Sequence, residues 1–485
     1  MFPMSKPFVL NRILSVAACK GTRHLLRILK RGGTALPGKV AMKLCPDILP
    51  AVSEGMEIIV VTGTNGKTTT SGMIEQSLTA SGKTVLANKS GANLLSGVTA
   101  EFACASTAVG KPRFRYAVIE CDEGALKQVV PRIRPKVIVV TNLFRDQLDR
   151  YGEVMHTRDE VLEGIKKVPE CTLVLNADDS LTASIALDVP NKVVWYGLSV
   201  PGSEDTTVGL SDATHCIRCG AEYRYRFHTY AHLGAFFCPE CGYERPEPEV
   251  SVTEISHMDG AGTDALLQEG KTSAVPGSGT PEPVTRSIHV ALPAVYNLYN
   301  AVAAIAAYRA AGYDEEEMIR ALATVRSSFG RMESFDFGER KVQCILVKNP
   351  AGCNQAVDFV TSLSDPYVLV LALNDQTADG HDISWIWDVN YEKFAGSRNL
   401  SAVYIAGDRA EDMLLRMKYA GVPTEKLILE KDYGRLLDMM KDTSESGSFH
   451  GIRSVFCMPN YTSMLTLRTL LGEATGKNAY WERQA

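Results

Sequence analysis

The chain of 485 residues is too long for a single hydrophobic core, so we expect two or three domains. Its composition, 45% hydrophobic and 22% charged, is that of an ordinary globular protein, and a net charge of −5 gives no indication of nucleic-acid binding. No apolar run approaches the roughly 20 residues that cross a bilayer. Twelve Cys in a sequence without a secretory signal predict reduced thiols and a cytoplasmic location.

The first 53 residues form a basic segment, in which apolar residues alternate with Lys and Arg over 8–45. This pattern predicts an amphipathic helix or a pair of helices. Two interpretations stay open. The segment packs on the protein body with its basic face in solvent, or it makes peripheral contact with an anionic membrane surface or an anionic lipid substrate.

A phosphate-binding loop is predicted next, in the stretch Ile-Ile-Val-Val-Thr-Gly-Thr-Asn-Gly-Lys-Thr-Thr-Thr at residues 58–70. An apolar strand precedes the Gly loop, and a helix over 68–80 follows it. The loop N–H groups and the helix N-terminus would face an anion, Lys67 adds a positive charge, and the Thr68 hydroxyl can ligate Mg²⁺. Val61 stands where the G-x-x-x-x-G-K-[ST] motif has its first Gly, so a chance turn is the alternative. The flanking strand and helix favour a nucleotide site.

Strand and helix patterns alternate from residue 57 to about 200, which predicts an α/β fold with a parallel sheet covered by helices on both faces. The expected strands after the first are 84–86, 116–120, 137–141, 172–175 and 193–196, with helices at 124–130 and 157–167. Polar groups follow three of these strands: Glu120 and Asp122, then Asn142, then Asn176 to Asp179. Each could cap a helix, but ligands gather at the carboxyl ends of parallel strands. Glu120 ends its strand as a Walker-B carboxylate would, where it could hold Mg²⁺.

Four cysteines form two C-x₂-C pairs with eighteen residues between them: Cys216, Cys219, Cys238 and Cys241. This spacing predicts a closed, structural Zn²⁺ site in a zinc ribbon, with two disulfides or unpaired thiols as the alternative. Residues 258–285 are rich in Gly, Ser, Thr and Pro and are expected to be a flexible loop. Ribbon and loop together form an insert at about 212–287.

Helices are expected at 300–311 and 314–325, and strand and helix patterns resume after about 335. The expected strands, 344–347, 367–373, 402–406, 426–429 and 454–457, predict a second α/β domain. Its most unusual stretch, residues 373–388, follows a strand and carries two of the four Trp beside a His and four acids. Trp385 and Trp387 could also be core residues.

Four motifs follow one another in an order that resembles the Mur ligases: residues 62–68, Asn142 to Asp149, Asn176 to Asp179, and Tyr296 to Ala301. The resemblance implies an enzyme that activates a carboxylate with ATP as an acyl phosphate. It implies that Lys67 and Thr68 serve the phosphates and Mg²⁺, that Glu120 serves Mg²⁺, that Asn297 and Asn300 approach the adenine, and that Arg331 lies near the phosphates. The nucleotide-binding residues it implies are Gly63, Thr64, Asn65, Gly66, Lys67, Thr68, Thr69, Asn142, Asn297, Asn300 and Arg331. Gln147 replaces the usual His of its motif, which leaves a second metal site open.

The stretch 373–388, the run Lys348 to Gln355 and the zinc ribbon together resemble the MurT family, the Mur-ligase-like subunits of lipid II isoglutaminyl synthase. This resemblance implies amidation of the D-glutamate α-carboxyl in the lipid II stem peptide, at the inner face of the cell membrane. It implies a GatD-like glutaminase partner that supplies ammonia and takes an acidic residue from this chain. That residue is expected to be Asp382, with Asp379 and Asp388 as alternatives; the other interpretation of Asp382 is a helix cap, and the two roles are compatible. Lys67, Glu120 and Asp382 are the expected catalytic residues.

The expected domains are the basic segment 1–53, an ATP-binding central domain 54–334 that carries the insert, and a C-terminal α/β domain 335–485 that contacts the partner. Two other functions remain open: a stand-alone ligase of the Mur or folylpolyglutamate type, and a non-catalytic scaffold that binds ATP. A purified chain that incorporates amino acid without a partner would favour the first, and absence of ADP release with substrate present would favour the second.

Overall fold

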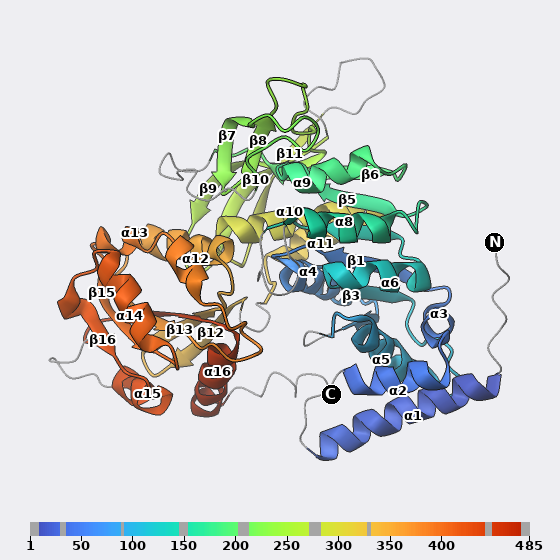
Figure 1. Cartoon of the computed structure of the whole chain (residues 1–485), viewed down its shortest axis with the longest axis horizontal. Coiled ribbons are helices and arrows are strands. Elements are labelled where there is room, and N and C mark those ends of the chain that lie inside the picture. Colours follow the sequence, from blue (N-terminus) through green and yellow to red (C-terminus); the bar gives the residue numbers. More distant parts are fainter. Residues whose placement is uncertain are drawn as a thin grey trace.

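The structure, a computed structural model, describes residues 9–29, 35–88, 92–144, 154–201, 213–270, 283–326, 331–441 and 449–476. Two α/β units lie side by side, and a cysteine-rich hairpin stands at the top of the first (Figure 1). The basic N-terminal segment forms three helices at the lower edge of the first unit: α1 (Val9–Ile28), α2 (Ala35–Leu44) and α3 (Ile48–Ser53). None of the described helices is long and apolar enough to span a membrane.

The first unit contains a nine-stranded sheet of order β11-β10-β9-β6-β5-β4-β1-β3-β2. Its strands are β1 (Glu57–Thr62), β2 (Val85–Ala87), β3 (Tyr116–Glu120), β4 (Val137–Val140), β5 (Thr172–Asn176), β6 (Val193–Leu198), β9 (Val250–Met258), β10 (Thr263–Glu269) and β11 (Val284–Val290). Strands β1 to β6 and β9 are parallel, and β10 and β11 add an antiparallel edge. The predicted parallel sheet is confirmed.

Both faces of this sheet are buried, as the continuous apolar strands require. Ile59 and Val61 belong to one core with helices α4, α10 and α11, whereas Ile58 and Val60 belong to another with α1 to α3, α5, α6 and α8. The helices are α4 (Lys67–Ala80), α5 (Leu95–Ala105), α6 (Glu123–Ile133), α8 (Val154–Ile165), α9 (Ser180–Ser184), η1 (Ile185–Leu187), α10 (Val295–Ala311) and α11 (Glu315–Leu322). Helix α10 is buried on almost every side, because its many Ala side chains let it lie close to both α4 and the sheet.

The expectation of a flexible loop over residues 258–285 is wrong for its first part. Residues 263–269 form β10, whose side chains alternate between buried and half-buried, with Ala265 and Leu267 in the core. A strand of this pattern is stable because it pairs with β9 on one side and β11 on the other. The richest run of Gly, Ser and Pro, at 271–282, lies outside the described residues.

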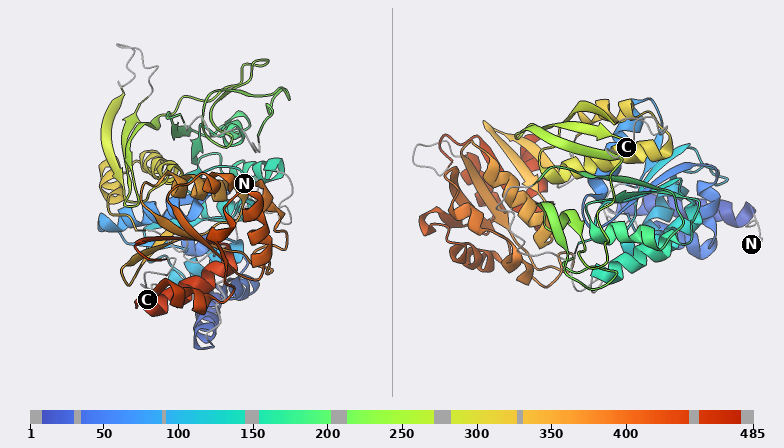
Figure 2. Two further views of the ribbon diagram at one scale, coloured as in Figure 1. Left: turned by 90° about the vertical axis from the view of Figure 1, so that its left-hand side faces the viewer. Right: turned by 90° about the horizontal axis from the view of Figure 1, so that it is seen from above.

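The second unit contains a six-stranded sheet of order β12-β13-β17-β14-β15-β16, parallel except for the β12–β13 hairpin. Its strands are β12 (Arg331–Phe337), β13 (Arg340–Ile345), β14 (Tyr367–Ala372), β15 (Leu400–Ala406), β16 (Leu427–Leu429) and β17 (Ser454–Pro459). Its helices are α12 (Pro350–Ser362), η2 (Ser384–Asp388), α13 (Glu392–Ala395), α14 (Ala410–Tyr419), η3 (Thr424–Lys426), α15 (Tyr433–Lys441) and α16 (Tyr461–Thr475). The expected boundary at 334/335 falls inside β12, which pairs with the second sheet along its length. Seen from above, the first unit lies between the N-terminal helices and this second sheet (Figure 2).

Candidate functional site

The phosphate-binding loop connects β1 to α4, as the motif predicts. Gly63 and Gly66 have φ values of 119° and 85°, which only Gly adopts without strain. A side chain at Gly66 would also collide with the Asn300 side chain of α10. Helix α4 begins at Lys67 directly after this Gly, so the N–H groups of its first turn have no carbonyl partner within the helix. The backbone at the start of α4 can therefore hold an anion.

The loop is held in shape by the segment that follows β4. Asn65 N–H donates to Asn142 Oδ1 (3.0 Å), while Asn142 Nδ2 and the Thr141 hydroxyl both donate to the Asn65 carbonyl (3.2 and 2.6 Å). The Thr64 hydroxyl accepts from Phe144 N–H and donates to the Phe144 carbonyl, both at 3.1 Å. Asn142 thus belongs to the predicted site as a support for the loop. Arg145 to Asp149, including Gln147, lie outside the described residues.

Lys67 makes a buried ion pair that the sequence did not predict. Its Nζ lies 2.7 Å from Glu123 Oε1 and donates to the Gly63 carbonyl at 2.5 Å. Burial raises the pKa of Glu123, although the Lys67 charge opposes that shift. Glu123 ends the acidic run that begins at Glu120, but spacing alone does not indicate which of these acids meets Lys67. Asp122 N-caps α6 by accepting from Gly124 N–H (3.2 Å).

Glu120 lies where a Walker-B carboxylate is expected. It is the last residue of β3 and pairs in register with Val61, two residues before the loop. Asn88 fixes its backbone through two hydrogen bonds, at 2.8 and 2.7 Å. Thr68 is the second residue of α4 and is half-buried. Thr68 follows β1 through the loop, and Glu120 ends the neighbouring strand β3. A hydroxyl and a carboxylate are oxygen donors of the kind Mg²⁺ takes, so the residues present fit this ion.

A pocket opens between the two units, beside the loop. Residues from the first unit that line it include Asn65, Gly66, Thr69, Asn142, Tyr230, Tyr296 and Asn300; those from the second include Ile345, Lys348, Asn349, Gly352 and Gln355. Asn349 N-caps α12 and its Nδ2 donates to Asn65 Oδ1 (3.3 Å), so the second unit touches the loop directly. The pocket therefore brings groups of both units against one anion site.

The two predicted adenine-binding residues, Asn297 and Asn300, differ from each other in their access to the pocket. Asn300 lines the pocket, and its Oδ1 accepts from the Thr70 hydroxyl at 3.3 Å. Asn297 is buried behind it, where it accepts from Asn300 Nδ2 (3.2 Å) and donates to the Pro293 carbonyl (2.6 Å). Asn297 is therefore placed to hold Asn300. Arg331 opens β12, but its side chain is outside what the structure describes.

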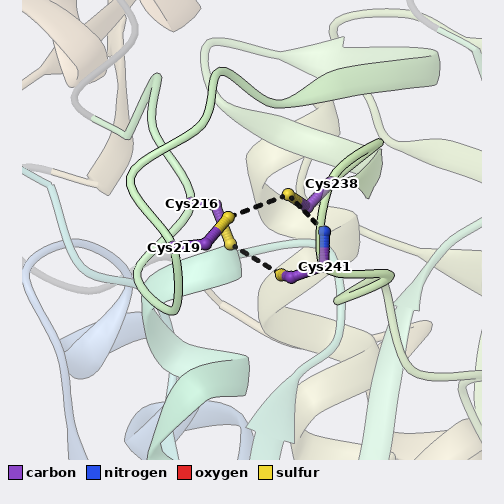
Figure 3. Close-up of side chains that lie close together, drawn as sticks. All are labelled: Cys216, Cys219, Cys238 and Cys241. Carbon is purple, nitrogen blue, oxygen red and sulfur yellow. Dashed lines mark hydrogen bonds between the residues drawn. The ribbon is translucent and has the colours of Figure 1, made fainter.

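The four cysteines come together at one end of the hairpin of β7 (Arg224–Tyr230) and β8 (Leu233–Phe237) (Figure 3). Their Sγ atoms all lie within 4.8 Å of one another, with Cys216–Cys241 at 3.5 Å and Cys219–Cys238 at 3.4 Å. None of the four is in a disulfide. A tetrahedral zinc with Zn–S bonds of 2.3 Å separates its sulfurs by about 3.8 Å, so the cluster fits Zn²⁺. Gly220 and Gly242, both at positive φ, close the two turns.

The ribbon is joined to the first unit through two buried aspartates after β5. Asp178 accepts from Arg245 Nε (2.6 Å), the Tyr299 hydroxyl (2.6 Å) and Leu198 N–H (2.7 Å). Asp179 N-caps α9 and lies 3.3 Å from Nε2 of His232, which is fully buried. Burial acts to raise the pKa of Asp179, but the neighbouring His232 and the hydrogen bonds from the Thr182 hydroxyl and Leu143 N–H lower it below its usual value. Both aspartates make structural contacts, and for Asp179 the helix-cap interpretation is confirmed.

The stretch 373–388 lies at the carboxyl end of β14, as predicted. Asp382 is exposed and accepts from Ser384 N–H (2.8 Å) at the start of η2; its hydrogen bonds to Ser384 lower its pKa. Asp379 is buried and binds both the N–H and the hydroxyl of Thr462 (2.8 and 2.5 Å). Trp387 is 48% exposed, so it is not a core residue. It packs edge-on against exposed Tyr419.

Comparison with known proteins gives a consistent result. Residues 61–215 match the Mur ligase middle domain, and residues 346–464 match the MurT ligase C-terminal domain. The chain is 32% identical to the lipid II isoglutaminyl synthase (glutamine-hydrolyzing) subunit MurT of Streptococcus pneumoniae, over 95% of this chain and 97% of that protein.

Two solved structures share the fold at low identity. MurF of Acinetobacter baumannii is 17% identical, with a TM-score of 0.63 over 90% of this chain and 80% of its own. Folylpolyglutamate synthase of Mycobacterium tuberculosis, complexed with ADP and AMPPCP, is 15% identical, with a TM-score of 0.58 over 94% and 99% of the two chains.

Proposed function

This chain belongs to the MurT family, and from that premise we propose that it is the ATP-dependent subunit that amidates lipid II in peptidoglycan synthesis. The reaction converts the D-glutamate α-carboxyl of the stem peptide to D-isoglutamine. The observation that carries the proposal is similarity over 95% of the chain to a subunit named glutamine-hydrolyzing lipid II isoglutaminyl synthase. The anion site between the two units supports it, because a carboxylate and a triphosphate must meet in one place.

In the first step a carboxylate oxygen of the substrate attacks the γ-phosphorus of ATP, forming an acyl phosphate and ADP. The N–H groups at the start of α4 and Lys67 hold the phosphates, and Gly63 to Thr69 with Asn142 and Asn300 shape the nucleotide side of the pocket. Thr68 and Glu120 would hold Mg²⁺, which neutralises charge on the transferring phosphoryl group when bound. Phosphates entering the loop compete with Glu123 for Lys67. Arg331 is proposed to lie near the same phosphates.

In the second step ammonia attacks the acyl carbonyl, the C–O bond to phosphate breaks, and the nitrogen loses a proton to give the amide. A partner subunit with glutaminase activity, similar to GatD, supplies the ammonia. We assign Asp382 to complete the catalytic group of that partner. Its exposure and its lowered pKa suit an ionised carboxylate that orients a His on another protein. Asp379 is already bound to Thr462, and Asp388 is exposed but stays a second choice.

The C-terminal unit is proposed to carry the partner. Trp387, Tyr419 and Leu415 are large, exposed and close to one another along η2 and α14, and aromatic groups of this kind anchor protein interfaces. Zinc in the ribbon has a structural role, because four thiolates leave no open ligand position.

The test is amidation by the complex purified from its own cell, with glutamine or with ammonium chloride as nitrogen source. Lys67→Ala should lose amidation with either source while glutamine hydrolysis continues. Asp382→Asn should lose glutamine hydrolysis and glutamine-dependent amidation but keep the ammonia-dependent reaction. Asp388→Asn is the matched control and should keep both. Amidation without ATP consumption would overturn the proposed function, and normal glutamine hydrolysis in Asp382→Asn would overturn that assignment.

A further inference from the structure

Helix α1 carries an apolar stripe on its outer face. Leu10, Leu14, Ala17, Gly21, Leu25 and Ile28 are spaced by three or four residues and therefore lie on one side of the helix. The four large side chains are between 51% and 64% exposed. Of the eighteen large apolar side chains exposed in the described residues, eight lie between residues 9 and 44. The stripe runs for about 27 Å along the helix axis.

Three of the four Lys and Arg side chains of α1 point the opposite way, toward the body of the protein. Lys20 donates to the Ser106 carbonyl (2.6 Å), Arg23 pairs with Glu101, and Arg12 donates to the Ala51 carbonyl (3.0 Å). A surface helix normally places its apolar side chains inward and its charges in water. The expectation that the basic face of this segment is solvated is therefore wrong for these residues, because carbonyls and a carboxylate of the body satisfy them.

The N-terminal segment is also basic as a whole. Nine of the 51 Lys and Arg lie in the first 46 residues, and none of the 56 Asp and Glu does. Arg27 on α1 and Lys39 and Lys43 on α2 are exposed, beside the apolar side chains of both helices. An outward apolar stripe with exposed cations around it matches the chemistry of a membrane interface, where acyl chains lie beneath anionic headgroups.

We propose that the outer face of α1 and α2 docks on an anionic phospholipid membrane, with the apolar stripe at the level of the headgroups. The inference rests on the proposed function, because it holds the enzyme where a lipid-linked substrate is found. The helices lie at the end of the molecule opposite the C-terminal sheet (Figures 1 and 2), so docking there leaves the C-terminal unit accessible to a partner.

The test is flotation of the purified complex with vesicles of phosphatidylglycerol and phosphatidylcholine, and with vesicles of phosphatidylcholine alone. We expect binding to the anionic vesicles that weakens with added salt. Leu14→Gln combined with Leu25→Gln should weaken it about tenfold or more, since each removes an exposed apolar side chain from the stripe. Leu187→Gln, at a side chain 53% exposed on η1, is the matched control and should bind as the unaltered protein does.

Amidation rates on two forms of the substrate distinguish membrane docking from the proposed function. On detergent-dispersed substrate the double variant should amidate at the normal rate, whereas on substrate in vesicles it should be slower. Equal flotation of the double variant would overturn the docking proposal and leave the proposed function intact. Self-association of the unaltered protein that the double variant loses, seen by light scattering without lipid, would also overturn it, because a second copy would then cover the stripe.

Discussion

The buried ion pair Lys67–Glu123 allows the contribution of Lys67 to folding stability to be measured separately from its contribution to catalysis. The two side chains are 11% and 6% exposed, so neither charge has much water around it. Removing one member of such a pair leaves the other uncompensated, at a cost of about 3–5 kcal/mol. We expect Lys67→Ala to lower the free energy of unfolding by about 3 kcal/mol, near the lower limit because the Glu123 carboxylate can take up a proton.

The effect should depend on pH with a definite sign. Burial already raises the pKa of Glu123 while Lys67 opposes that shift, so the pKa rises further when Lys67 is removed. A carboxyl group with a raised pKa binds more protons in the folded state, and its contribution to stability falls as pH rises above about 4.3. The loss of unfolding free energy in Lys67→Ala should therefore be small near pH 4.5. It should be largest above the pKa of Glu123 in the folded variant.

A double-mutant cycle completes the test, with urea unfolding and hydrogen exchange of β1 and β3 measured at pH 5 and pH 8. Adding Glu123→Gln to Lys67→Ala should restore about 2 kcal/mol of the free energy of unfolding at pH 8, because the buried carboxylate is gone. The control is Lys393→Ala, which breaks the more exposed pair with Asp358 and should cost under about 1 kcal/mol. A coupling energy below about 0.5 kcal/mol, or a deficit that does not change with pH, would refute the reasoning.

Two further predictions concern the ribbon and the loop. Cys216→Ser should release the bound zinc, about one equivalent per chain, and lower the thermal midpoint, as metal analysis and calorimetry will report; Cys104→Ser, away from the cluster, should change neither. Gly66→Ala should weaken ATP binding at least tenfold in calorimetric titration, because a Cβ at φ 85° meets the Asn300 side chain. Gly82→Ala, at φ 76° with open space around it, controls for backbone strain alone, and equal affinities in the two variants would contradict the steric argument.

The loop and the cysteine cluster could be predicted because their chemistry is local. A Gly-rich turn between a strand and a helix, or two C-x₂-C pairs, needs only short-range spacing to define its geometry. Glu123 could not be assigned in the same way. It meets Lys67 only because β3 pairs with β1 in a register that places Val61 opposite Glu120, and register is a property of the sheet.

Neither the orientation of α1 nor strand β10 could be predicted from the sequence, because both depend on contacts with other segments of the chain. Periodicity predicts that a helix has two faces, but which face turns inward depends on partners such as Glu101 and the Ser106 carbonyl, supplied by other segments. Composition averaged over 258–285 was dominated by the Gly-rich and Pro-rich run at 271–282. It concealed seven residues whose alternating burial makes an ordinary strand once β9 and β11 are beside it.

The ribbon illustrates how a module that is separate in sequence becomes part of a site in space. Tyr230, at the end of β7, lines the pocket beside the loop, and its ring stacks on Phe144, whose backbone holds Thr64. His232, in the turn of the same hairpin, packs against Phe144 and faces Asp179. Because β7 and β8 form a two-stranded sheet of their own, and such hairpins are marginal in water, the cysteine cluster at their other end has a structural task. By fixing the hairpin, a metal held by the four cysteines would also fix one wall of the pocket beside the loop, which would give a closed, four-thiolate site a role in an ATP-dependent ligase.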